Sequence, residues 1–333
     1  MRFLIVGLGS MGKRRIRNLQ YLKAGEIIAY DPRDDRCQEA KERYGIMTFP
    51  GFDEAMAADP DVMIISTPPD LHMPYARIAA MNGKHFFTEA SVVDNEMDEV
   101  ITLCSGKDIV GVPSCTMRFN SSVRVIRDLV CSGSVGSILA FTHHFGQYLP
   151  DWHPWEDYRS FYVAKRETGA CREIVPFELV WLTWILGDVE KISCFKEKLS
   201  TLDLDIDDVY QVLLRFKHGA LGSLLVDVIS RVAYRSARFI SETAVIEWVS
   251  SEKRVRVFQL EKGWWDEYHE PEAIEEKGYV ATENPYIEEM KCFVQAIRDG
   301  GEYPYSFSED KKILGLLYAA ERSSADQVHV DTV

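Results

Sequence analysis

A glycine-rich turn between a short apolar run and a helical pattern is the feature that most constrains this fold. Residues 3–6 are apolar, and the next six read Gly7-Leu8-Gly9-Ser10-Met11-Gly12. Over the first 115 residues, further apolar runs alternate with helical patterns; these runs lie at 27–30, 62–66, 84–88 and 109–112. Such alternation predicts an α/β domain with a parallel, doubly wound sheet.

The turn has the form G-x-G-x-x-G, which is a weak signal alone but here follows a strand and opens a helix. Gly7 permits the tight turn, Gly9 lets the backbone approach a pyrophosphate, and Gly12 lets helix and strand pack closely. The helix N-terminus offers N–H groups to phosphates, so Ser10 and Met11 join the three glycines as predicted cofactor-binding residues. The alternative is a glycine turn in a sheet that binds no nucleotide.

An acidic residue ends the second predicted strand, as expected for a site that binds a dinucleotide. Asp31 follows Gly12 by nineteen residues, close to the spacing typical of a carboxylate that binds the adenosine ribose. Its charge would repel the extra phosphate of NADP, so the sequence favours NAD as the cofactor. Arg33 and Arg36 leave NADP open as the second choice, because either guanidinium would suit a 2′-phosphate.

The pattern changes after about residue 118. An aromatic-rich loop at 146–165 precedes a long apolar helix at 174–186, and a series of strands with tight links then runs to about residue 260. Consecutive strands with short links predict a large, mainly antiparallel open sheet. We therefore predict an N-terminal Rossmann domain at 1–117 and a C-terminal α+β domain at 118–333, whose last helices have room to pack back on the first domain.

Charge and cysteine usage limit the partners. Thirty-eight basic residues against 52 acidic ones give a formal net charge of −14, which disfavours nucleic-acid binding. Seven scattered cysteines without a Cys-x-x-Cys pair favour a reducing cytoplasm and predict neither disulfides nor a metal site. No uncharged apolar run reaches the ~18 residues that a membrane span needs.

A run after the third predicted strand carries a family resemblance. Ser66-Thr67-Pro68-Pro69-Asp70-Leu71-His72, then Gly83-Lys84-His85 and Glu89, resembles the Gfo/Idh/MocA family of sugar and cyclitol oxidoreductases. That family has a Thr-Pro-x-x-x-His run, then Gly-Lys-His, then Glu-Lys-Pro. Met117-Arg118-Phe119 and Trp184-Ile185-Leu186-Gly187 are similar to later family motifs.

The resemblance implies a fold, a reaction and several contacts. It implies a Rossmann domain, an open C-terminal sheet that often makes dimers or tetramers, and hydride transfer between a nicotinamide and a sugar. Thr67, Pro68, His72 and Glu89 are then expected at the cofactor. The residues that we expect at the substrate lie near the family's substrate helix or have a positively charged side chain that suits a phosphate or carboxylate. They are Arg118, Tyr158, Arg159, Lys165 and Arg166.

The departures from the family pattern concern the catalytic groups. Ala90 stands where the family's active-site lysine is expected, and Phe177 where its histidine is expected. The acid four residues earlier is Glu173, where the family usually has aspartate, and a later acidic position holds Val180. The usual mechanism therefore cannot be carried over to this chain.

Four residues remain as predicted catalytic groups. Glu173 occupies a family position, and Glu178 lies in an apolar helix, which predicts a raised pKa and a role as acid or base near neutrality. The alternative for Glu178 is a structural ion pair with an arginine such as Arg118 or one at 172. Tyr148 and His153 lie in the aromatic loop, whose composition suits a sugar but also an aromatic cluster at a subunit interface.

Three functions from different classes follow. The leading one is an NAD(P)-dependent oxidoreductase that acts on a sugar or sugar derivative, with phosphorylated, nucleotide-linked and acidic sugars all left open. The second is an NAD(P)-binding regulator without redox turnover. The third is a glycosidase that uses NAD only transiently. All three have a small sugar-type ligand, no nucleic acid and no membrane.

Overall fold

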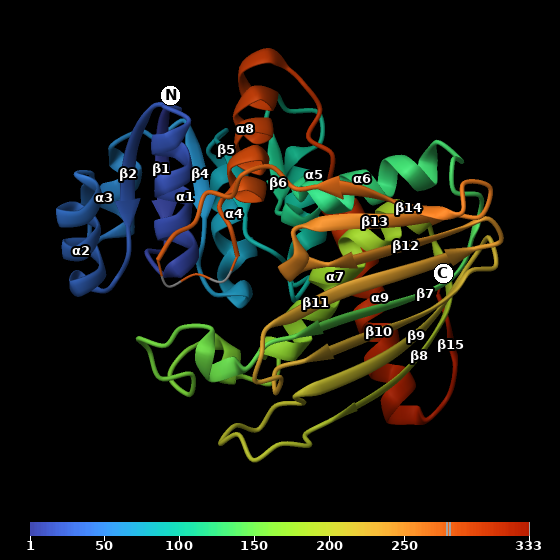
Figure 1. The fold of residues 1–333 in the computed structure, drawn as a ribbon. Helices are drawn as coiled ribbons and strands as arrows, with labels where there is room; N and C mark the ends of the chain where they lie inside the picture. Colours follow the sequence, from blue (N-terminus) through green and yellow to red (C-terminus); the bar gives the residue numbers. More distant parts are fainter. Residues whose placement is uncertain (278, 280, 333) are drawn as a thin grey trace. The chain divides into compact units, whose positions relative to one another are not determined.

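The computed structural model of the chain describes residues 1–277, 279 and 281–332. The chain forms two compact units (Figure 1). Unit 1 comprises Met1–Thr116 and Glu283–Lys311, and unit 2 comprises Met117–Thr282 and Lys312–Val333. The sequence predicted a boundary at 117/118 and allowed the last helices to pack on the first domain; in the structure the first boundary lies at 116/117, and Glu283–Lys311 belongs to unit 1. The second boundary falls inside the last helix.

Unit 1 contains a six-stranded sheet in which every neighbouring pair is parallel. Its order is β3-β2-β1-β4-β5-β6, with β1 (Arg2–Val6), β2 (Glu26–Tyr30), β3 (Met47–Phe49), β4 (Val62–Ile65), β5 (His85–Thr88) and β6 (Gly111–Pro113). This confirms the predicted doubly wound sheet. The strand order reverses between β1 and β4, and in such sheets ligands bind beside that point at the carboxyl ends of the strands.

Helices cover the strands of this sheet. They are α1 (Ser10–Tyr21), α2 (Asp34–Tyr44), α3 (Phe52–Ala57), η1 (Pro69–Leu71), α4 (His72–Met81), α5 (Met97–Cys104) and α8 (Asn284–Asp299). Every residue of β4 is buried, as expected of a parallel strand covered on both faces. The core joins Phe3, Ile64 and Phe87 of the strands to Met290 and Phe293 of α8.

Unit 2 contains a nine-stranded sheet that is antiparallel except where β7 pairs with β10. Its order is β14-β13-β12-β11-β7-β10-β9-β8-β15, with β7 (Ile138–Gly146), β8 (Val189–Glu197), β9 (Val209–Phe216), β10 (Leu221–Asp227), β11 (Tyr234–Ser241), β12 (Ala244–Val249), β13 (Arg254–Gln259), β14 (Trp264–His269) and β15 (Val330–Asp331). The predicted, mainly antiparallel second sheet is confirmed.

One face of this sheet is covered. The helices and short turns of unit 2 are η2 (Thr116–Phe119, which begins at the last residue of unit 1), α6 (Ser121–Cys131), η3 (Leu149–Asp151), η4 (Tyr162–Ala164), α7 (Ala170–Leu186), η5 (Ser250–Glu252) and the second part of α9 (Phe307–Asp326). Trp181 of α7 packs edge-on against Phe239 and Trp248 of the sheet, with ring centroids 6.3 and 5.9 Å away. On the other face, Phe195 and Leu213 are 71% and 52% exposed.

Among the residues that the structure describes, no helix is both long and apolar enough to cross a bilayer.

Candidate active site

The glycine turn joins β1 to α1, and each of its three positions accommodates glycine for a different structural reason. Gly7 has φ +97°, and a Cβ there would lie 2.6 Å from the carbonyl oxygen of Ser66. A Cβ on Gly12 would lie 1.9 Å from the carbonyl oxygen of Gly7. The space over Gly9 is open, because the nearest atom to a Cβ there is Nη1 of Arg36 at 3.9 Å. The fold thus requires Gly7 and Gly12, whereas Gly9 leaves room for an approaching group.

This open space lies at the N-terminus of α1. Helix α1 has no side-chain cap at Gly9 and no acidic residue in its first turn. The first N–H groups of an α-helix have no partner within the helix, and the helix dipole favours an anion there. The turn therefore fits a pyrophosphate.

Asp31 stabilises the same turn through hydrogen bonds. Its carboxylate is 3% exposed and accepts hydrogen bonds from the backbone N–H of Leu8 at 2.8 Å and of Arg33 at 2.9 Å. Each carboxylate oxygen can accept a second bond, so a ribose hydroxyl still finds an acceptor. Nη1 of Arg36 lies 3.7 Å from Asp31, while the guanidinium of Arg33 pairs with Asp35 at 2.6 Å.

Two polar groups after β4 lie at the carboxyl end of the strand, beside the reversal of strand order. Nε2 of His72 lies 2.9 Å from the carbonyl oxygen of Thr67, and burial lowers the pKa of His72, although that contact opposes the shift. The neutral ring donates from Nε2, which leaves Nδ1 as an acceptor. Within the described part of the chain, Nδ1 of His72 and Oγ1 of Thr67 are buried without a hydrogen-bond partner. Pro68 lies between them in sequence and starts the turn into η1.

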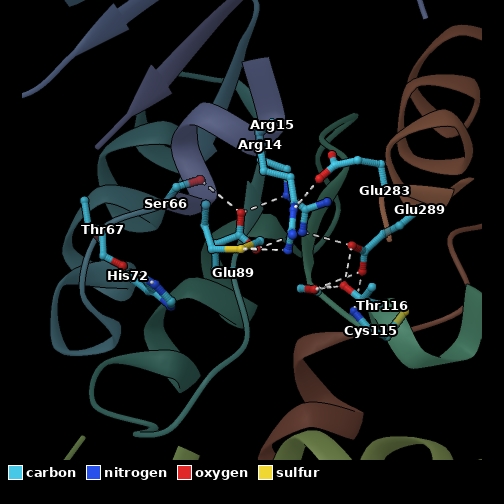
Figure 2. A network of polar contacts seen from close by, with 12 residues as sticks. Arg14, Arg15, Ser66, Thr67, His72, Glu89, Cys115, Thr116, Glu283 and Glu289 are labelled. Carbon is cyan, nitrogen blue, oxygen red and sulfur yellow. Dashed lines mark hydrogen bonds and ion pairs between the residues drawn. The ribbon is translucent and has the colours of Figure 1, made fainter. Parts of the chain in front are cut away.

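Glu89, also predicted at the cofactor, lies in a buried polar network (Figure 2). Arg15 of α1 donates to both of its carboxylate oxygens at 2.8 Å, and Ser66 donates at 3.0 Å. Burial alone would lower the pKa of Arg15, but Glu89 and Glu289 together raise it and keep the guanidinium charged. Glu89 thus fastens the end of β5 to α1, a role that the sequence did not predict.

Two acids near the start of α8 complete this network. Glu289 pairs with Arg15 at 2.9 Å and accepts bonds from Ser114, Cys115 and Thr116 at 2.6–2.9 Å. Glu283 pairs with Arg14 at 3.0 Å. Arg14 and Arg15 belong to a basic run near the start of α1, but nothing in its spacing points to partners some 270 residues away.

In unit 2, Glu173 lies in the first turn of α7. The hydroxyl of Tyr162 donates to its Oε1 at 3.2 Å. A carboxylate in the first turn is stabilised by the helix dipole. Glu173 is partly exposed, and we keep it as the predicted acid or base.

Glu178 of α7 is fully buried, and the prediction that its pKa is raised is wrong. It accepts hydrogen bonds from Arg235 at 2.7 Å, His143 at 2.8 Å and Trp181 at 2.6 Å. Burial alone would raise the pKa of Glu178, but Arg235 and His143 together lower it to about 2. At neutral pH this carboxyl holds no proton to exchange. The structural alternative for Glu178 is right in kind, but its partners are Arg235 of β11 and His143 of β7.

The aromatic loop holds the other two predicted catalytic residues. The guanidinium of Arg231 lies 3.8 Å from the ring centroid of Tyr148. His153 stacks on Trp155 and tilts against Phe161, with ring centroids 5.3 and 5.1 Å away. Both residues are partly exposed.

The predicted substrate cations lie mostly among acids of the same unit. Arg159 beside Tyr158 pairs with Asp157 at 2.8 Å and with the acid at 203, and Arg166 pairs with Asp205 at 2.5 Å. Lys165 is exposed. Arg118 is buried, donates to the carbonyl oxygen of Val180 at 3.4 Å and lies against Trp184. The sequence analysis did not single out Arg235, because no spacing along the chain places it beside Glu178.

Across the described ranges, no group of three or more histidine, cysteine or acidic side chains is placed to hold a metal ion.

A glycine turn that feeds a helix at the head of a doubly wound parallel sheet defines a dinucleotide-binding protein. The sequence model described as "Oxidoreductase family, NAD-binding Rossmann fold" matches residues 1–110, and that of the "GFO/IDH/MocA C-terminal domain" matches residues 123–247. The chain belongs to the Gfo/Idh/MocA family. It is an oxidoreductase with an NAD-binding Rossmann domain, which confirms the predicted family, enzyme class and cofactor.

Relatives with known activities match nearly the whole chain. The myo-inositol 2-dehydrogenase of Thermotoga maritima is 25% identical over 351 residues, which cover 97% of this chain and 96% of that protein. The levoglucosan dehydrogenase of Pseudarthrobacter phenanthrenivorans is 23% identical, over 98% and 97% of the two chains. A solved levoglucosan dehydrogenase in complex with NADH has a TM-score of 0.87 at 18% identity, over 100% of this chain and 99% of that one.

Proposed function

We propose that this enzyme transfers a hydride between NAD and a hydroxyl-bearing carbon of a sugar or sugar derivative. The observation that carries the proposal is the open space over Gly9 at the N-terminus of α1, beside the Asp31 carboxylate. Relatives that match almost the full chain are dehydrogenases of inositol and levoglucosan, both polyhydroxylated rings.

Each residue of the site has one task in this proposal. The amides from Gly9 to Gly12 bind the pyrophosphate, Asp31 accepts from the adenosine ribose, and the unpartnered Thr67 and His72 atoms bind the rest of the cofactor. When bound, the nicotinamide supplies or accepts the hydride. Glu173 moves the proton of the substrate hydroxyl, because Glu178 is held ionised by its ion pairs.

The test is the absorbance of NADH at 340 nm, with NAD⁺ and a panel of sugars, sugar acids, sugar phosphates and nucleotide sugars. Net formation of NADH supports the proposal. Binding of NAD⁺ without turnover would instead support a regulator, and release of an aglycone without net NADH would support a glycosidase.

We also propose that the exposed face of the nine-stranded sheet binds a second copy of this chain in a dimer or tetramer. Arg238, Glu247, Arg256 and Glu267 form a row of alternating charge across β11–β14, and Phe195 and Leu213 are exposed on the same face. Such a row is complementary to itself under a two-fold axis. Light scattering should give at least twice the chain mass of 38.1 kDa, and Leu213→Lys should lower it; a monomeric wild-type chain would contradict the proposal.

The seven cysteines are thiols in the structure, none of them joined in a disulfide. This supports a cytoplasmic location. Localisation of a tagged full chain by fractionation tests it.

A further inference from the structure

The side chain of Arg235 lies on the covered face of the sheet in unit 2, beside the position where the family histidine is replaced. Arg235 is a residue of β11, directly across from Phe145 of β7. Its guanidinium carbon lies 4.7 Å from the ring centroid of Phe145 and 5.8 Å from that of Phe177. A permanent cation therefore lies next to an apolar residue at the expected histidine position.

Arg235 shares its carboxylate partner with a histidine. Glu178 is the acid that pairs with Arg235, and it also accepts from Nε2 of His143. Nδ1 of His143 lies 2.7 Å from the carbonyl oxygen of Ser236, so both ring nitrogens face oxygens that only accept. Glu178 is therefore shared between Arg235 and a histidine that is itself held by the backbone.

The guanidinium of Arg235 also has N–H donors that are not fully used by the surrounding acceptors. One nitrogen of Arg235 donates to Glu178, and Nη1 lies 3.4 Å from Sδ of Met117, a weak acceptor. Nε is buried and has no hydrogen-bond partner within the described residues. The side chain as a whole is 20% exposed. Burying an N–H donor without an acceptor costs free energy. A negatively charged ligand group that accepts hydrogen bonds from Arg235 would remove this cost, so the guanidinium is suited to bind one.

We propose that Arg235 binds an anionic group of the substrate, so that the sugar on which this enzyme acts carries a carboxylate or a phosphate. The inference rests on the proposed sugar oxidoreductase function and narrows its substrate class. A guanidinium presents parallel donors that match either anion. Glu178 and His143 are positioning residues, because they fix the guanidinium without reaching the substrate themselves.

The arginines predicted from the sequence support this choice by contrast. Arg159 and Arg166 are each more than half exposed and each pair with carboxylates of their own unit. Surface pairs of this kind contribute little and leave no excess charge. Arg235 differs from both, because its side chain is only 20% exposed and its Nε has no hydrogen-bond partner within the described residues.

The test compares glucose, galactose and mannose with their uronic acids and their 6-phosphates, in the NADH assay and with the full chain. The wild-type enzyme should prefer one anionic series over the neutral sugars, and the preferred series separates a carboxylate from a phosphate. Arg235→Gln should lower kcat/KM for that series by roughly 10–150-fold, mainly through KM, since bonds to charged groups contribute about 1.5–3 kcal/mol. Neutral sugars should change less than about threefold.

Two further variants keep the test decisive. Arg235→Lys keeps the charge beside Glu178 and loses the planar fork, so it should fold and show an intermediate loss. Arg322→Gln, an exposed arginine of α9, is the matched control and should behave as wild type. Equal losses for neutral and anionic sugars in Arg235→Gln, or a wild-type enzyme that prefers neutral sugars, would overturn the inference and leave the dehydrogenase function intact.

Absence of turnover with every sugar would count against the proposed function rather than against Arg235. In that case calorimetric titration of glucuronate and glucose 6-phosphate into the NADH complex decides the role of Arg235. Binding by the wild-type chain that is lost in Arg235→Gln supports the inference, and failure of both probes to bind the wild-type chain overturns it.

Discussion

Gly9 and Gly12 lie three residues apart in the same turn, but the structure assigns them different roles. The space over Gly9 is open, whereas a Cβ on Gly12 would overlap the backbone of Gly7. We expect Gly9→Val to keep the fold and to weaken NAD binding by ~100-fold or more, about 2.7 kcal/mol. Gly12→Val should lower the melting temperature itself. Calorimetry and thermal melts of both variants measure this, and wild-type NAD affinity in Gly9→Val would refute the cofactor site.

Asp31 has a structural role besides the binding role that we propose for it. Its carboxylate accepts the backbone N–H of Leu8 and lies 3.7 Å from Arg36. Asp31→Ala should cost about 1–3 kcal/mol of folding free energy, because the buried Leu8 N–H loses its acceptor. It should also reduce the preference for NADH over NADPH by about tenfold, since the carboxylate that repels a 2′-phosphate is gone. Fluorescence titrations give both affinities, and an unchanged ratio would mean that Asp31 does not contact the ribose.

Glu173 lies in the first turn of α7, and its place in the chain matches the acid expected from the family resemblance. Glu173→Gln keeps the side-chain size and removes its capacity to carry a proton. We expect turnover to fall by ~10²–10⁴-fold while NAD affinity stays within a few-fold. Tyr162→Phe removes only the hydroxyl that donates to Glu173 and should cost much less. A change confined to KM would make Glu173 a binding residue and shift the catalytic role to Tyr148 or His153.

At the scale of elements, Glu178 fastens α7 to β7 and β11 through His143 and Arg235. The pKa of Glu178 is about 2, below the ordinary value of 4.5. The ion pairs therefore stabilise the fold above about pH 4.5, and this contribution is lost as the pH falls toward 2. Glu178→Gln should cost about 3–5 kcal/mol near neutrality, and its difference from wild type should shrink with acid.

Urea unfolding at a series of pH values measures this effect. Glu190→Gln, at an exposed position on β8, is the control and should follow the wild-type curve. A constant difference between Glu178→Gln and wild type from pH 7 to about pH 3 would show that the ion pairs do not set the stability of α7.

The elements that could be predicted are those whose pattern is contained in a short stretch of the chain. Apolar runs that alternate with helical patterns predicted the parallel sheet, and consecutive strand patterns with short links predicted the second sheet. The edge strands β3, β14 and β15 were missed, because β3 and β15 have only three and two residues and β14 is mostly exposed. The partners of Arg15 and Glu178 were missed for another reason: α8, β7 and β11 bring them together from distant parts of the chain.

At the scale of the whole molecule, each unit has its own buried polar centre. Arg15 with its two glutamates ties α1, β5 and α8 together in unit 1, and Glu178 with Arg235 and His143 ties α7 to the sheet in unit 2. The first centre supports the helix that follows the glycine turn, to which we assign the cofactor. The second holds Arg235, to which we assign the anionic group of the substrate.

Most centrally, we propose that this chain oxidises or reduces a sugar with NAD, although Ala90 and Phe177 stand where the lysine and histidine of its family are expected. The direct measurement is NADH formation at 340 nm by the wild-type chain with the sugar panel, alongside Gly9→Val. We predict net NADH formation with at least one sugar and none in Gly9→Val. Tight binding of NAD⁺ by a wild-type chain that reduces it with no sugar would contradict a sugar dehydrogenase function.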